Sequence, residues 1–139
     1  MKKKLFLTAL IAFVLSSCGC NKKVCQQTVD LTGTWTIVTA MDKETKNGDK
    51  PATITFDGNG QVNGNATVNS FFGGYTLKGN NISFGNMGMT RMMGKSMDIE
   101  QAVNEALDNS ATVEINGKKA KVMNKDGKTV MTLVKKEYE

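Results

Sequence analysis

The sequence predicts one α+β domain: a curled antiparallel β-sheet of about eight strands, barrel-like, with one amphipathic helix packed against it. Three observations lead to this fold class. Runs with a two-residue apolar period alternate with glycine-containing turns, and a single segment with a helical period interrupts them. About 110 residues follow a polar N-terminal tether, enough for one domain with a sizeable core. We therefore expect five or six strands, the helix, and then three more strands.

The strands before the helix are predicted from alternating apolar residues and from the turns between them. Residues 57–60, Asp-Gly-Asn-Gly, form one turn signal, and residues 78–81, Lys-Gly-Asn-Asn, form another. Between such turns the apolar residues fall on every second position, as in a half-buried strand. The residues expected to share one face of their strand are Trp35, Ile37 and Thr39; Ile54 and Phe56; Val62, Gly64, Ala66 and Val68; Tyr75 and Leu77; and Ile82 and Phe84.

The segment that follows Met97 breaks the strand pattern. Its apolar residues recur at positions i, i+3, i+4, i+7 and i+8, which places them on one face of an amphipathic helix. Asp98 is the expected N-cap, with Gln101 three residues later as in a capping box. Asn109 and Ser110 are the expected stop. The helical face consists of Ile99, Ala102, Val103, Ala106 and Leu107.

Two hairpins are predicted after the helix. Asn116-Gly117 divides the run TVEINGKKAKVMN into two alternating halves, and this dipeptide is the strongest short hairpin signal. Asp126-Gly127 marks the second hairpin. The last run, Val130 to Val134, is apolar on both faces, so we expect it to be a central strand.

The chain begins with the pattern of a bacterial lipoprotein. Lys2 to Lys4 form a basic region, and Leu5 to Leu15 form an apolar run too short to span a bilayer as a mature helix. Small Ser16 and Ser17 precede Cys18, as in a lipobox. We expect cleavage before Cys18 and lipid on its thiol and new amine, which anchors the protein to a membrane. The alternatives are an ordinary secreted protein whose Cys18 carries no lipid, and an apolar anchor that is retained.

This interpretation divides the chain into a signal peptide at 1–17, a lipidated tether at 18–29 and a folded domain at 30–139. Loss of the signal peptide removes three lysines and lowers the formal net charge from +5 to +2, so basicity gives no reason to expect nucleic-acid binding. Similarity to sorting patterns after the lipidated cysteine indicates the outer membrane, facing the periplasm. Cys20 and Cys25 lie in the tether, where we expect spare thiols or a local pair; a redox or metal role is the alternative.

Three later stretches resemble the META/HslJ family of small bacterial envelope lipoproteins: ITFDGNGQVNGNATVNSFFGGYTLKGNNISF, MTRMMGKSMDIEQAVNEAL and DGKTVMTL. The likeness covers about residues 31–135. It implies a role in envelope stress tolerance and no known enzymatic activity. An ion pair between Arg91 and Glu100 is expected to hold a loop on the helix. The motif positions, taken as candidates for an interaction loop, are Asn65, Asn69, Tyr75, Thr90, Arg91 and Glu100.

The chain departs from the family pattern at two positions. The resemblance implies a pair of cysteines where this chain has Val68 and Gly94. Both are replaced together, as follows if the two cysteines normally pair. Any redox role that depends on that disulfide is therefore in doubt for this chain.

Five methionines lie between Met87 and Met97. Thioether sulfur suits Cu(I), and the candidate ligands are Met87, Met89, Met92 and Met93. In the family, Met92 and Met97 occupy a loop that leads into the helix, which favours flexible side chains that fill the gap between helix and sheet. A third interpretation is a soft apolar surface for a partner peptide. We expect packing, and we assign no metal site.

The residues give little support to catalysis. The chain has no histidine to act as a base, and lipid would occupy Cys18.

Gly33-Thr34-Trp35 is similar to the G-x-W of lipocalins and would imply a carrier of a small apolar ligand, although three strands after the helix argue against it. We expect a non-enzymatic binding module without a cofactor, bound to a membrane through Cys18. A lipocalin-like carrier and a periplasmic Cu(I)-binding protein are the alternatives.

Overall fold

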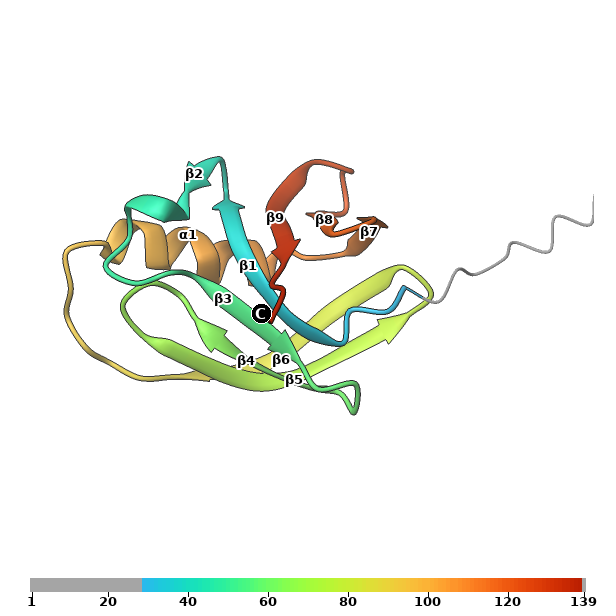
Figure 1. Ribbon diagram of the computed structural model, residues 1–139, viewed down its shortest axis with the longest axis horizontal. Helices are drawn as coiled ribbons and strands as arrows, with labels where there is room; N and C mark the ends of the chain where they lie inside the picture. The colour runs from blue at the N-terminus through green and yellow to red at the C-terminus, as the bar shows by residue number, and fades with distance from the viewer. Residues whose placement is uncertain (1–28, 139) are drawn as a thin grey trace, which may run out of the picture.

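The computed structural model describes residues 29–138 (Figure 1). The expected signal peptide, the lipidation site at Cys18, and Cys20 and Cys25 lie outside the described residues. Within residues 29–138, the helix falls short of the length and apolarity that a membrane-crossing helix needs.

One antiparallel sheet of nine strands forms most of the domain, with one α-helix and one short 3₁₀ helix. The order of strands and helices agrees with the sequence prediction: six strands, the helix, then three strands. The elements are β1 (Gly33–Ala40), β2 (Lys43–Glu44), η1 (Thr45–Asn47), β3 (Thr53–Phe56), β4 (Gln61–Asn65), β5 (Ser70–Lys78), β6 (Asn81–Met89), α1 (Met97–Asp108), β7 (Thr112–Asn116), β8 (Lys119–Met123) and β9 (Thr129–Lys135).

The sheet curls until its two ends meet. Its strand order is β2-β1-β3-β4-β5-β6-β7-β8-β9, and β1 also pairs with β9, so β1 and β3 to β9 close into a ring. The predicted turns supply the connections: Asp57 Oδ1 accepts the main-chain N–H groups of Asn59 and Gln61 at 2.7 and 3.0 Å. Gly117 and Gly127 adopt φ of 61° and 77° in the two C-terminal hairpins, a conformation that glycine enters without steric cost. The predicted α+β, barrel-like fold is confirmed.

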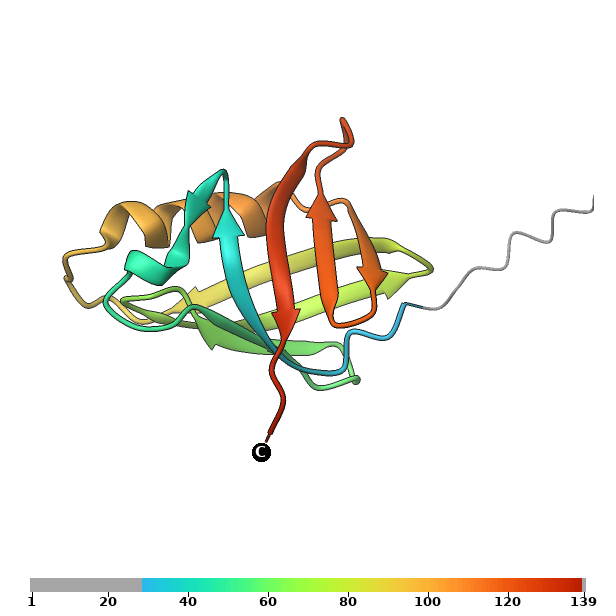
Figure 2. The same ribbon diagram turned by 45° about the horizontal axis from the view of Figure 1, so that its top comes forward.

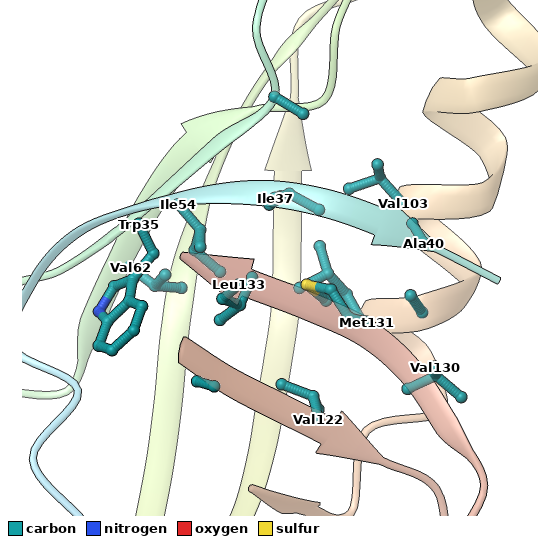
Figure 3. Packing of buried hydrophobic residues seen from close by; sticks show 14 of the residues in the cluster. Trp35, Ile37, Ala40, Ile54, Val62, Val103, Val122, Val130, Met131 and Leu133 are labelled. Carbon is teal, nitrogen blue, oxygen red and sulfur yellow. The ribbon is translucent and has the colours of Figure 1, made fainter. Parts of the chain in front are cut away.

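The ring is weakest between β6 and β7, which pair only at Asn81 and Thr112. The rest of β6 runs on without β7 beside it, and α1 connects the two strands. In Figures 1 and 2 the helix lies across the ends of β1 and β9. Val103 of α1 is beside Ala40 of β1 (Figure 3), and both side chains are fully buried. The helix therefore covers the open side of the ring with its predicted apolar face.

The interior of the ring is filled by side chains from the strands (Figure 3). Trp35 is 1% exposed, and its indole N–H donates to the main-chain oxygen of Leu31 at 2.7 Å. The rings of Phe56 and Tyr75 pack edge to face with centroids 4.9 Å apart. The other large side chains that are almost wholly buried include Ile37, Ile54, Phe71, Met131, Leu133 and Val62.

Two local predictions were wrong. A bulge between Ile37 and Thr39 in the β1–β9 pairing brings Ala40, and not Thr39, into the core. Helix α1 begins at Met97 with Ser96 as its N-cap, and Asp98, the predicted cap, instead forms an exposed ion pair with Lys43 at 3.1 Å. Ser96 makes no side-chain capping bond to the helix, because its hydroxyl bonds to other segments.

Candidate functional site

Three of the six motif positions, Asn69, Thr90 and Glu100, meet where the turn after β4 faces the loop after β6 and the start of α1. Asn69 lies at the centre and is 2% exposed. Its Oδ1 accepts from the Thr90 hydroxyl at 2.9 Å and from the Met92 main-chain N–H at 2.6 Å. Its Nδ2 donates to the Met92 main-chain oxygen and to Glu100 Oε1, both at 2.9 Å. We call this group, Asn69, Thr90, Glu100 and the main chain of Met92, the Asn69 clasp.

Glu100 connects the clasp to the first turn of α1. Its side chain is 4% exposed, and its two oxygens accept from Asn69: Oε2 from the main-chain N–H at 2.7 Å and Oε1 from Nδ2. A carboxylate near a helix N-terminus is also favoured by the helix dipole. The predicted ion pair with Arg91 was wrong, because no salt bridge among residues 29–138 joins Arg91 to Glu100, and Arg91 is exposed.

A second group of polar residues supports the clasp from the turn at residues 66–69. Asn65 Oδ1 accepts the Thr67 main-chain N–H at 2.8 Å. Thr67 is fully buried and adopts φ of 88°, a strained conformation for a β-branched residue. Its hydroxyl lies 3.2 Å from the Ser96 hydroxyl, which also accepts the Asp49 main-chain N–H at 2.9 Å. These bonds hold the turn against the segment that begins the helix.

Val68 and Gly94 lie side by side beneath this group. A Cβ built on Gly94 would stand 2.7 Å from Cγ2 and 2.8 Å from Cγ1 of Val68. The two positions at which the family resemblance implies paired cysteines are therefore adjacent in space. Here the isopropyl group of Val68 and the carboxylate of Asp49 occupy the volume that a side chain at position 94 would need.

Tyr75 does not join the clasp. It lines an open hollow of ≈ 480 Å³ at the rim of the ring, together with Val29, Leu31 and Leu77. Burial is the main cause that raises the Tyr75 pKa above its ordinary value of 10.0, and the negative charge of Asp57 adds to it. The hollow lies at the rim because aromatic and aliphatic side chains fill the interior of the ring.

Met97, the fifth methionine of the stretch, is half-buried at the start of α1, and the other four divide into two pairs. Met87 and Met89 on β6 pack against the core, and the Met89 sulfur accepts from Asn104 Nδ2 of α1 at 3.6 Å. Packing is thus confirmed for Met87 and Met89. Met92 is 52% exposed and Met93 is 88% exposed, so the prediction that Met92 fills the gap between helix and sheet was wrong. The reason is a contact between segments distant in sequence: Asn69 binds both main-chain groups of Met92, and the side chain faces solvent.

This division weakens the copper hypothesis. Two of the four candidate thioethers face the core and two face solvent, whereas a Cu(I) site needs its ligands to converge on one point. Among the residues that the structure describes, no group of three or more Asp, Glu, Cys or His side chains is placed to hold a metal ion.

The clasp leaves a short exposed loop, which we call the display loop, at residues 91–95. Arg91, Met92, Met93 and Lys95 are all exposed in it. Phe72 is 60% exposed on β5, and its ring lies over Gly88 of β6, where an added Cβ would be 2.5 Å from the ring. Three of the five large apolar side chains exposed in the described chain are therefore Met92 and Met93 of this loop and Phe72 of β5, the strand that pairs with β6.

The display loop lies far from the point where the described chain begins. Figures 1 and 2 show the connection between β6 and α1 at one end of the long axis and the start of the described chain at the other. Sequence reasoning missed Phe72. The doublet Phe71-Phe72 was the available signal, because adjacent residues of a strand face opposite sides and only one of them can enter the core.

Comparisons with known proteins agree with this fold. The META domain profile matches residues 27–137. An NMR structure of a protein from Burkholderia xenovorans is 25% identical, covers 83% of this chain and 88% of that chain, and has a TM-score of 0.62. The crystal structure of a DUF4847 family protein from Bacteroides vulgatus is 14% identical, covers 78% of this chain and 95% of that chain, with a TM-score of 0.56, and shows likeness of fold alone. No curated protein matches the sequence.

Proposed function

The chain belongs to the META domain family, and from that premise we propose that it is a non-enzymatic binding module, anchored to a membrane by lipid on Cys18, that presents the display loop to another protein of the cell envelope. In this proposal the module supports envelope integrity under stress. The anchor and the loop have separate supports, and each has its own test.

The observation that carries the proposal is the saturation of the Asn69 clasp. All four hydrogen-bonding positions of the Asn69 amide and both oxygens of Glu100 are engaged within the fold. The Thr90 hydroxyl donates to Asn69 and also accepts the Ser70 main-chain N–H at 3.0 Å. Motif residues that are fully engaged in this way stabilise a conformation and have no free group to offer a substrate. They therefore support a role in holding the display loop in place.

The chemistry of the display loop favours one kind of partner. Arg91 and Lys95 place two positive charges on either side of the exposed thioethers of Met92 and Met93. Methionine side chains adapt to the shape of an apolar contact, and rim charges select a partner of opposite sign. We expect a protein segment that has an apolar centre and acidic residues around it.

The anchor is supported by the sequence pattern before Cys18 and by the geometry of the domain. A lipid on Cys18 would hold the start of the domain near the bilayer, and the display loop lies at the other end of the long axis (Figure 1). A Cys18→Ser variant should move from the membrane fraction to the aqueous fraction. Intact-mass analysis should find an acylated N-terminus in the protein of natural sequence and not in the Cys18→Ser variant. An unacylated N-terminus in the natural protein would overturn the anchor.

Site-specific photo-cross-linking in intact cells tests the loop. A photoreactive phenylalanine analogue replaces Phe72, and the matched control carries it at Tyr138, an aromatic residue that is 79% exposed and bonds to Thr34. We expect a discrete protein adduct from position 72 that is lost when Arg91 and Lys95 are changed to glutamate. Equal adducts from both positions, or an adduct that survives the charge reversal, would contradict the proposed surface.

A further inference from the structure

We propose that Met92 and Met93 form a methionine-oxidation site that regulates the display loop. The regulatory effect rests on the proposed function, whereas the oxidation itself depends only on the exposure of the two side chains. Among residues 29–138, Met92 and Met93 have the most exposed methionine side chains, at 52% and 88% exposure. Susceptibility of a thioether follows its access to the oxidant.

The remaining described methionines serve as internal controls, because they differ in exposure within one chain. Met131 is 1% exposed in the core, and Met87 and Met89 pack against the core from β6. An oxidant in solution therefore meets Met93 first, Met92 next and Met131 last. In the proposed location outside the cytoplasm, small oxidants reach the protein before cytoplasmic defences act on them.

The reaction is an oxygen transfer from a hypohalous acid. With hypochlorous acid, the sulfur forms a bond to oxygen and the oxygen–chlorine bond breaks. Sulfur loses two electrons, chlorine is reduced to chloride, and the proton of the acid is released. A methionine sulfoxide reductase reverses the change with two thiols, which become a disulfide while the sulfoxide oxygen leaves as water.

The fold is arranged so that oxidation changes the surface and leaves the clasp intact. The Asn69 amide binds the main-chain N–H and oxygen of Met92, and none of its four hydrogen bonds goes to the thioether. Oxidation converts a flexible apolar side chain into a polar one, which suits an apolar partner poorly. Between Arg91 and Lys95, the loop would then present two polar sulfoxides in place of its apolar centre.

Oxidation mapping tests the site. The full chain in detergent, with Cys20→Ser and Cys25→Ser so that thiols do not consume the oxidant, receives one to two equivalents of hypochlorous acid. Peptide mass spectrometry should find sulfoxide at Met93 at about tenfold or more the level at Met131, with Met92 between them. Equal sulfoxide levels at exposed and buried methionines, or earlier oxidation of Met87 and Met89, would overturn the inference.

Photo-cross-linking from position 72 tests the consequence. Oxidation should lower the adduct yield by about fivefold, and a Met92→Leu/Met93→Leu variant should keep its yield after the same treatment. A yield that oxidation leaves unchanged would overturn the regulatory step. If no adduct forms even before oxidation, the proposed function has failed, and the mapping alone then decides whether the oxidation site exists.

Discussion

Replacement of Asn69 by alanine perturbs the clasp at its centre. The change removes four side-chain hydrogen bonds, to the Thr90 hydroxyl, to Glu100 Oε1 and to both main-chain groups of Met92. The main-chain bond from residue 69 to Glu100 Oε2 stays. The variant therefore leaves a nearly buried carboxylate with half of its partners, beside three polar groups that water can reach in part.

The cost follows from the burial of these groups. An unpaired buried polar group costs about 1–3 kcal/mol, and charged groups lie at the upper end. Glu100 is 4% exposed and should contribute most of that range, whereas the exposed loop lets water replace part of the bonding to Met92. We expect Asn69→Ala to lower the free energy of unfolding by about 3–4 kcal/mol. Asn65→Ala, the matched control, removes one acceptor and should cost about 1 kcal/mol.

Urea unfolding of the full chain measures both losses. Trp35 is the sole tryptophan and is buried, so its fluorescence reports the loss of the core. The slope against urea should be unchanged, which would show that stability and not compactness has altered. A loss below about 1 kcal/mol for Asn69→Ala, or a loss equal to that of Asn65→Ala, would refute the reasoning. A double variant with Glu100→Ala should lose less than the sum of its single changes, because the two residues share bonds.

Three further predictions follow from the same structure. A Val68→Cys/Gly94→Cys variant should form a disulfide, since a Cβ built on Gly94 would stand 2.7 and 2.8 Å from the two γ carbons of Val68. The disulfide should add about 3 kcal/mol over the reduced form in urea unfolding, and failure to oxidise would show that the two positions are not adjacent. Met89→Ala should cost about 2 kcal/mol and the half-exposed Met92→Ala less than about 1 kcal/mol in the same assay, and the reverse order would contradict the assigned packing. The Tyr75 pKa is raised in the folded state, so the contribution of this residue to stability is complete below the unfolded-state pKa and is lost as pH rises through the folded-state pKa. Tyr75→Phe should therefore remove part of the fall in stability at pH above 10.0. An unchanged alkaline stability profile would contradict this.

Most of the fold could be predicted because the decisive signals are local. The turns at 57–60, Asn116-Gly117 and Asp126-Gly127 each depend on a few neighbouring residues, and all three join paired strands in the structure. The helical face of α1 was likewise visible from spacing alone, and its five predicted residues are buried. Such features need no knowledge of which segments meet.

The candidate site could be predicted only in part, because its bonds join segments that are distant in sequence. Asn69 and Glu100 are 31 residues apart, and nothing in either local pattern selects the other over Arg91. The exposure of Met92 has the same origin, since a main-chain bond to Asn69 turns the side chain outward. The bulge that places Ala40 in the core depends on the pairing of β1 with β9, a contact between the two ends of the domain.

Amide hydrogen exchange at Met92 tests the central claim, that the clasp holds the display loop in a fixed conformation. The Met92 side chain is exposed, but its main-chain N–H donates to Asn69 Oδ1 at 2.6 Å. We expect this N–H to exchange about 100-fold or more slowly than in an unfolded chain, and to lose that protection in Asn69→Ala. Exchange at the unfolded rate in the natural protein would show that the loop is free, and would contradict the account.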